Sequence, residues 1–153
     1  MNTGILFGNK ILDVVFVAWF FAQFYKVLSS LIFEKKLNLK RAWETGGMPS
    51  SHSSTVTALT TAVGISLGLN SPLFAASLVF AIIVMHDAAG IRRAAGKQAG
   101  VLNDLGKSLS TLFEGKFHQE QLKELLGHTP VEVLVGAILG FVVALFMRGY
   151  LLA

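Results

Sequence analysis

Four long apolar stretches dominate the pattern of the chain. They cover residues 11–33, 54–69, 72–89 and 131–152, and each contains few charged side chains. A helix needs roughly 20 apolar residues to cross the hydrocarbon core of a bilayer. The pattern therefore predicts four membrane-crossing helices, of which the second and third are short. The first stretch is longer than the apolar part of a signal peptide and only Lys10 precedes it, so we expect a retained anchor.

The second and third stretches are expected to form a helical hairpin. Residues 68–72 between them read Gly-Leu-Asn-Ser-Pro, which is typical of a tight turn. The second stretch contains several Thr and Ser residues, so we expect it to pack inside a bundle rather than face lipid.

The pattern changes after the third stretch. Apolar residues recur there at steps of three and four, whereas polar residues fall between them. The apolar positions are Leu102, Leu105, Leu109 and Leu112, and the polar ones are Asn103, Asp104, Lys107 and Ser108. This spacing predicts an amphipathic helix that lies at the membrane interface or packs on the bundle.

The composition supports a membrane protein. Apolar residues make up 53% of the chain and charged residues 14%, against about 25% charged in ordinary soluble domains. This balance argues against a soluble protein and against disorder. The 153 residues predict a single domain over residues 1–153, with an all-α, multi-pass helical fold. Cysteine is absent, which excludes disulfides, a thiolate nucleophile and cysteine ligands for zinc.

The distribution of charge predicts the orientation. The net charge is +4, from 13 basic and nine acidic residues, and the basic residues alternate with apolar stretches, so no nucleic-acid partner is expected. In a four-span topology one side carries Lys26, Lys35, Lys36, Lys40, Arg41, Arg92, Arg93, Lys97, Lys107, Lys116 and Lys123. Only Lys10 and Arg148 are left for the other side. By the positive-inside rule the rich side is cytoplasmic and both termini lie outside.

Three polar clusters fall on this same side, at residues 46–53, 86–97 and 127–132. In the first, glycines and serines at a helix start leave backbone N–H groups for an anion. His52 could then act as a general acid or base on a bound phosphate. Helix capping alone also explains the serines, which include Ser50 and Ser51.

The second cluster could hold a phosphate with its cationic side chains. Arg93 and Lys97 are four residues apart and share a face if the segment is helical, and Arg92 adds a second guanidinium. Basic residues beside a membrane also serve simply as a topology signal. Asp87, at the end of a span, is expected to be paired, with an arginine as a plausible partner, or to be functional.

The third cluster combines a helix cap with candidate catalytic groups. Thr129-Pro130-Val131-Glu132 has the form of a capping box with proline at the first helical position. In the functional interpretation His128 is a nucleophile or base, and Glu132 fixes its tautomer and stabilises the imidazolium. The two roles of Glu132 are compatible. His118 lies in a polar stretch and is expected at the surface.

Two of these motifs resemble those of a known superfamily. Pro49-Ser50-Ser51-His52 is similar to the Pro-Ser-Gly-His motif of the type 2 phosphatidic acid phosphatases (PAP2), which share their site with vanadium haloperoxidases. Residues 128–136 resemble the last motif of the superfamily, His-x-Pro-x-Asp-Val-x-x-Gly. With residues 87–98, the motifs identify the chain as similar to the divergent PAP2 family, in its YuiD-like branch, over about residues 8–150.

The resemblance implies a mechanism for each matching residue. His128 would attack phosphorus and form a phosphohistidine, and Glu132 would orient it in place of the usual aspartate. His52 would protonate the leaving group. Ser50 would bind phosphate, and Ser51 replaces the glycine of the motif. The implied reaction needs no metal and no cofactor, because cationic side chains neutralise the phosphate.

The chain departs from the superfamily pattern at its basic positions. Around Arg41, Glu34 and Ala42 stand where the first motif has lysine and proline. Leu122, beside Lys123, stands where the last motif has arginine. We expect the missing positive charge to come from Arg92, Arg93, Lys97 and Arg41, with Asp87 in support.

These observations predict a multi-pass protein of the cell membrane that hydrolyses a lipid phosphomonoester at the cytoplasmic side. Phosphatidate, phosphatidylglycerophosphate and polyprenyl phosphates or diphosphates are all compatible substrates. One alternative is a protein that binds or transports a lipid phosphate without hydrolysis, and another is a small structural subunit. Four spans make a thin bundle, so a homo-oligomer is also compatible with the sequence.

Overall fold

The structure is a computed structural model that describes residues 3–34, 47–112, 122 and 127–153. Every regular element within these ranges is an α-helix, which confirms the all-α prediction for this part of the chain. The helices are α1 (Lys10–Glu34), α2 (Ser51–Leu67), α3 (Pro72–Ala89), α4 (Ile91–Leu112), α5 (Pro130–Phe146) and α6 (Arg148–Leu152).

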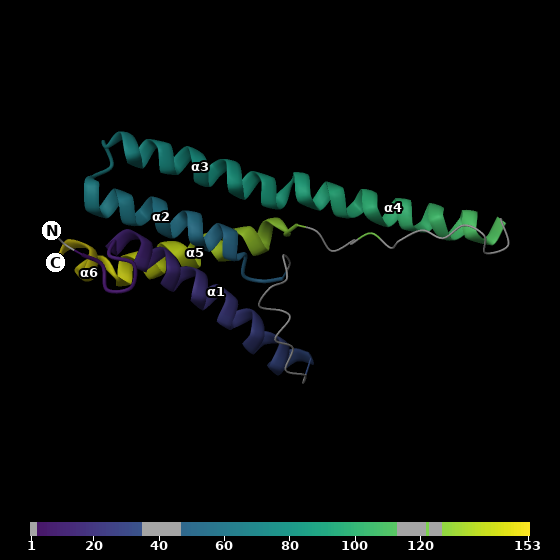
Figure 1. The fold of residues 1–153 in the computed structure, drawn as a ribbon, viewed down its shortest axis with the longest axis horizontal. Helices are drawn as coiled ribbons and strands as arrows, with labels where there is room; N and C mark the ends of the chain where they lie inside the picture. Colours follow the sequence, from purple (N-terminus) through teal and green to yellow (C-terminus); the bar gives the residue numbers. More distant parts are fainter. Residues whose placement is uncertain (1–2, 35–46, 113–121, 123–126) are drawn as a thin grey trace.

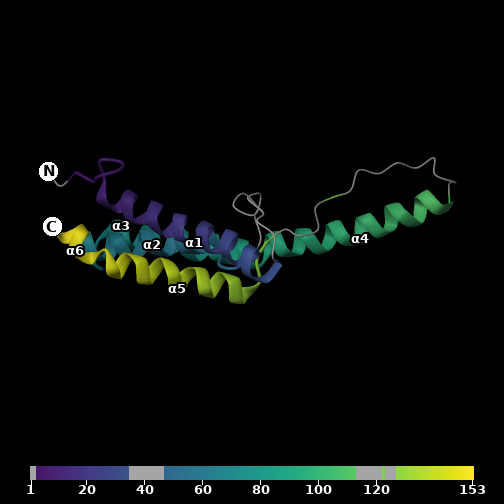
Figure 2. The ribbon, with the colours of Figure 1, turned by 90° about the horizontal axis from the view of Figure 1, so that it is seen from below.

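Helix α2 lies at the centre of the bundle, in contact with α1, α3 and α5 (Figure 1). Helix α4 continues the direction of α3 beyond the end of the bundle, as both views show (Figures 1 and 2). The short α6 and the two chain termini lie together at the opposite end. The bundle therefore has two distinct ends, one with the termini and one where α3 passes into α4.

Small residues let α2 and α5 pack closely. Gly136 and Gly140 are one turn apart on α5, and both are buried. A Cβ atom on Gly136 would lie 2.3 Å from the carbonyl oxygen of Ser50, and one on Gly140 would lie 2.1 Å from that of Ser54. Helices in membranes commonly approach through such stripes of small residues. The two backbones are therefore in direct contact.

Helix α1 packs on α2 in a similar way. Its fully buried residues Val14, Ala18 and Ala22 follow one another at steps of four, which places them on one helix face. The Ser54 hydroxyl of α2 donates to the carbonyl of Ala18 at 3.1 Å. The polar side chain predicted to need neighbours thus finds its acceptor on the adjacent helix.

The predicted hairpin between the second and third stretches is confirmed. Gly68 ends α2 with a positive φ of 86°, and the Ser71 side chain caps α3, which begins at Pro72. Two boundaries differ from the apolar stretches. Helix α2 begins earlier, at Ser51, because Ser50 caps it. The last stretch divides at Met147 into α5 and α6. The amphipathic prediction is confirmed by α4.

Two helical stretches among the described residues are long and apolar enough to cross a membrane. They are Lys10–Ser29 in α1 and Pro72–Leu112, which joins α3 and α4. Pro130–Phe146 is apolar but only 17 residues long, at the short end of the range for a span. Length and composition thus support two spans directly.

Asp13 forms hydrogen bonds with both the N-terminal segment and α6, at the end of the bundle that carries the termini. Its carboxylate is 2% exposed and accepts backbone N–H groups from Ile5 at 2.7 Å and Phe7 at 2.9 Å. It also accepts the hydroxyl of Tyr150 in α6. The ammonium group of Lys10 lies 5.4 Å from the centre of the Tyr150 ring. One buried carboxylate therefore joins the N-terminal segment to the last helix.

Candidate active site

The three polar clusters meet at the end of the bundle where α3 passes into α4. The Ser50 N–H, before α2, donates to the Glu132 carbonyl in α5 at 3.1 Å. The His128 N–H, before α5, donates to the Ala88 carbonyl in α3 at 2.9 Å. Backbone hydrogen bonds thus connect the start of α2, the end of α3 and the start of α5.

His128 is held in one orientation by Glu132. The imidazole is 2% exposed, and its Nδ1 lies 3.0 Å from the Glu132 Oε2 atom. The same oxygen accepts the Thr129 N–H at 3.2 Å, while the Thr129 hydroxyl accepts the Glu132 N–H at 3.3 Å. The predicted capping box is therefore confirmed. The carboxylate that caps α5 also fixes the imidazole ring, with Nδ1–H as its donor.

The second ring nitrogen of His128, Nε2, is buried and has no hydrogen-bond partner in the described part of the chain. Buried polar atoms without a partner are uncommon in proteins. The His52 ring, in the first turn of α2, lies 6.4 Å from the His128 ring centre to centre, with the planes tilted by 59°. His52 is exposed, so the pair joins a buried imidazole to an accessible one.

The serines of the first cluster shape the start of α2. Ser50 is fully buried, and its hydroxyl oxygen accepts the Ser53 N–H at 3.3 Å and the Ser53 hydroxyl at 3.0 Å. The capping interpretation of Ser50 is thus confirmed, and its own O–H remains a possible donor. The buried Ser51 follows as the first residue of α2. Both serines lie at the positive end of the helix dipole.

Lys26 is a site residue that the sequence interpretation missed. It follows Ala18 and Ala22 at the next step of four on α1, is 4% exposed, and its Nζ lies 3.5 Å from the Ser51 hydroxyl. In the sequence, Lys26 stood out only as one of the basic residues that predict the topology. The clue in the sequence was its position four residues after Ala22, which places it on the same face of the helix as Ala18 and Ala22. Three residues earlier, Gln23 Oε1 is buried and has no partner among the described residues.

The remaining predicted phosphate ligands have no described contact with the two imidazoles. Arg93 and Lys97 lie on α4, where both side chains are exposed and form no hydrogen bond or ion pair with a described residue. Lys97 is nine residues beyond Ala88, about 13 Å of helix rise. Arg92 belongs to α4, but its side chain is outside the described part, as is all of Arg41. Asp87 is partly buried in the last turn of α3.

Among the described residues, no three His, Asp or Glu side chains gather in a way that could hold a metal ion. The groups that the structure brings together at the site are two imidazoles, a carboxylate, serine hydroxyls and a buried ammonium group. This set suits nucleophilic attack on an anionic, phosphate-like group with proton transfer from a second imidazole.

Comparison with known proteins identifies the family of the chain. The sequence profile of the divergent PAP2 family matches residues 7–143. A protein of Bacillus subtilis (strain 168), named uncharacterized membrane protein YuiD, is 46% identical over 137 residues, which cover 83% of this chain and 86% of the relative. No solved structure matches the chain. The match over most of the chain shows that this protein belongs to the divergent PAP2 family.

Proposed function

We propose that this protein is a membrane phosphatase that hydrolyses a lipid phosphomonoester through a phosphohistidine. The observation that carries the proposal is the arrangement of His128. Its Nδ1 is held by Glu132, its Nε2 is buried and has no hydrogen-bond partner among the described residues, and its ring centre lies 6.4 Å from that of His52. Membership of the divergent PAP2 family supports the same chemistry.

In the first step, His128 Nε2 attacks phosphorus and forms a P–N bond as the ester P–O bond breaks. His52, as an imidazolium, donates its proton to the departing lipid oxygen, and Glu132 stabilises the positive charge on His128. In the second step, His52 takes a proton from water as the water oxygen attacks phosphorus. The P–N bond breaks, inorganic phosphate leaves, and both imidazoles return to their initial states.

The charge of the phosphate is met by groups around the start of α2. Ser50 and Ser51 lie at the positive end of the α2 dipole, and Lys26 approaches Ser51 from α1. Such fixed donors stabilise developing negative charge without a metal. Arg92, Arg93, Lys97 and Arg41 are proposed as further cationic groups, with Asp87 in support.

The topology that suits this reaction has four membrane-crossing helices, α1, α2, α3 and α5, and places the site at the cytoplasmic face. The outer sides of α1 and α3 expose large apolar residues, among them Phe20, Phe24, Phe80 and Ile83. These side chains would face lipid, so the bilayer is the expected partner. A lipid substrate would then reach the site by lateral diffusion.

The test is phosphate release from purified protein in lipid vesicles, without divalent metal. Phosphatidate, phosphatidylglycerophosphate and a polyprenyl phosphate would each be offered. We expect release with the unaltered chain, none with His128→Ala, and unchanged release with His86→Ala, which alters an exposed histidine of α3. Full activity of His128→Ala would contradict the mechanism. An acid-labile phosphoryl label on the protein, lost in His128→Ala, would support it directly.

A second candidate function is binding or transport of a lipid phosphate without hydrolysis. The exposure of Arg93 and Lys97 on α4 favours it, because these charges do not reach the described imidazoles in this structure. Specific binding of the lipid with no phosphate release over long incubation would support this function over the phosphatase.

A further inference from the structure

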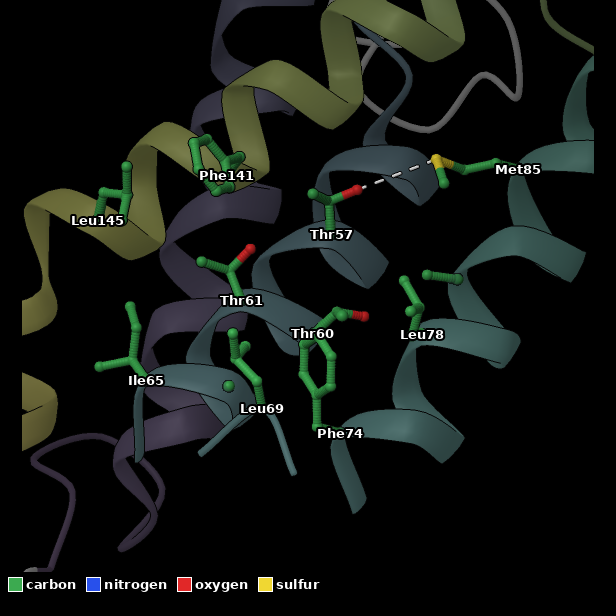
Figure 3. Close-up of a pocket in the computed structure, with 12 residues that line it drawn as sticks. Thr57, Thr60, Thr61, Ile65, Leu69, Phe74, Leu78, Met85, Phe141 and Leu145 are labelled. Atoms are coloured by element: carbon green, nitrogen blue, oxygen red, sulfur yellow. Dashed lines mark hydrogen bonds between the residues drawn. The ribbon is translucent and has the colours of Figure 1, made fainter. Parts of the chain in front are cut away.

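A groove with a volume of about 410 Å³ lies between α2, α3 and α5 (Figure 3). Small-molecule sites commonly have volumes of roughly 300–1,000 Å³. Thr57, Thr61 and Gly64 of α2 line one wall, and α3 and α5 contribute mainly apolar side chains. The groove is therefore large enough for part of a ligand and lies within the helices proposed to cross the membrane.

The interior is apolar although threonines line it. The Thr60 hydroxyl reaches the carbonyls of Val56 at 2.9 Å and Ser77 at 3.0 Å. The Thr57 hydroxyl points at the Met85 sulfur, 3.9 Å away (Figure 3). With their hydroxyls engaged, these residues offer methyl groups to the groove, and such a lining suits a hydrocarbon chain.

One end of the groove adjoins the candidate active site. Met85 lines that end, and three residues later Ala88 accepts the His128 N–H. On α2, Thr57 follows His52 by five residues. A helical turn rises about 5.4 Å, so the groove begins between one and two turns from the paired imidazoles. A phosphate at His128 and an alkyl chain in the groove could belong to one molecule.

The other end is closed by the α2–α3 turn. A Cβ atom on Gly64 would lie 3.1 Å from both Leu69 and Phe74, whose side chains form the floor. From Thr57 to Gly64 the helix rises about 10 Å, less than half of the roughly 30 Å hydrocarbon core. A chain in the groove would thus remain within one leaflet.

The groove has a side that faces the surroundings of the bundle. Leu78 on α3 and Phe141 and Leu145 on α5 border it and are 41%, 48% and 45% exposed. In a bilayer these edges would meet lipid chains. A chain could therefore enter sideways from the membrane without leaving an apolar environment.

We propose that this groove binds one hydrocarbon chain of the phosphorylated lipid, and that Gly64, Leu69 and Phe74 set the chain length it accepts. The proposal rests on the proposed function for the position of the phosphate. It adds a second binding region, on the opposite side of Thr57 from the imidazoles, that selects the lipid by its chain.

The experiment uses phosphatidate with a photoreactive diazirine at the end of one acyl chain, in phosphatidylcholine vesicles containing the full-length protein. After irradiation, labelled residues are mapped by mass spectrometry. We expect labels concentrated within residues 64–74. Thr61→Phe fills the middle of the groove and should lower this labelling by about tenfold or more, because the ring occupies the space that the chain would take. Ala76→Phe, which adds the same ring to the exposed face of α3, should leave it unchanged.

A smaller substitution keeps the test valid if Thr61→Phe does not fold. Gly64→Ala adds a single methyl group 3.1 Å from the side chains of Leu69 and Phe74, and it should remove labelling by the longest chains while keeping that by shorter ones. Labelling of residues 64–74 that Thr61→Phe and Gly64→Ala both leave intact would overturn the proposal. Equal labelling of these residues by a diazirine phosphatidylcholine would also overturn it.

The same experiment separates this proposal from the phosphatase. Labelling requires no hydrolysis, so localised labelling without phosphate release supports the groove and contradicts only the phosphatase. Phosphate release with labels spread evenly over the outer faces of α1 and α3 contradicts the groove alone.

Discussion

Gly136 of α5 lies against the backbone of Ser50 so closely that a Cβ atom on the glycine would be 2.3 Å from the serine carbonyl oxygen. Ser50 also donates its N–H to Glu132, one turn before Gly136. The contact thus joins Ser50, two residues before His52, to the helix that carries Glu132, the partner of His128. Close packing of α2 on α5 is what brings the two imidazoles together.

Gly136→Ala should therefore damage both stability and the site. The added methyl group must push α5 away from Ser50, since the contacted atoms are backbone. We expect a loss of about 1–3 kcal/mol of unfolding free energy, as for other overpacked positions. Phosphate release should fall as well, because the ring pair would separate. Thermal unfolding in detergent and the phosphatase assay check the two effects.

Gly149→Ala is the matched control for this prediction. Gly149 also lies in a helix, α6, but a Cβ atom there would meet nothing within 4 Å. We expect its activity to equal that of the unaltered chain and its stability to be equal or slightly higher, because alanine favours a helix over glycine. If Gly136→Ala behaved in the same way, the close contact of α2 with α5 would not determine the site.

Glu132 should have separable roles in catalysis and in capping. Glu132→Gln keeps a side chain that can close the capping box, since glutamine also serves there, but it removes the charge beside His128. We expect phosphate release to fall by about 10²- to 10⁴-fold, the usual contribution of acid–base catalysis, with little change in unfolding temperature.

Thr129→Ala should give the reverse result. It removes the hydroxyl that accepts the Glu132 N–H and should cost about 1 kcal/mol of stability. The Nδ1 contact of His128 does not involve that hydroxyl, so activity should fall far less than in Glu132→Gln. Comparable losses of activity in the two variants would mean that Glu132 acts only through the helix start.

The predictable parts of this protein depend on local sequence. The turn at Gly68, the capping box at Thr129 and the pairing of His128 with Glu132 each involve residues within a few positions of one another. Backbone geometry fixes what such neighbours can do. The spacing of the residues therefore carries enough information to predict the α2–α3 turn, the start of α5 and this part of the site.

The missed parts depend on which helices become neighbours. Lys26 is a site residue because α1 packs on α2 at Ser51, and nothing near Lys26 in the sequence specifies that partner. The charge pattern predicted the end of the bundle at which Arg93 and Lys97 lie, but it does not predict how far they are from the two imidazoles. Both residues belong to α4, which projects beyond the bundle (Figure 1).

Lys26 should contribute to phosphate binding more than to folding. We expect Lys26→Met to weaken binding of inorganic phosphate by about 10- to 100-fold, because a hydrogen bond to a charged group is worth about 1.5–3 kcal/mol. Lys26→Met also removes the other interactions of this buried side chain, so stability is measured beside phosphate affinity to separate the two effects.

Isothermal titration with inorganic phosphate and thermal unfolding measure these two effects. Lys10→Met is the control, because Lys10 lies at the other end of the same helix beside Tyr150. Phosphate affinity should be unchanged there. Equal affinities of Lys26→Met and the unaltered chain would exclude Lys26 from the phosphate site.

Asp13 and Tyr150 should affect stability without affecting the reaction. Asp13→Ala removes the acceptor shared by Ile5, Phe7 and Tyr150, so several donors lose their partner and the unfolding temperature should fall. Tyr150→Phe removes one donor and should cause a smaller decrease. Tyr25→Phe, on the exposed side of α1, should cause none.

Because this cluster lies at the opposite end of the bundle from His128, phosphate release per folded molecule should remain constant in all three variants (Figure 1). Activity lost in proportion to the number of broken hydrogen bonds would show instead that the two ends are coupled through α1.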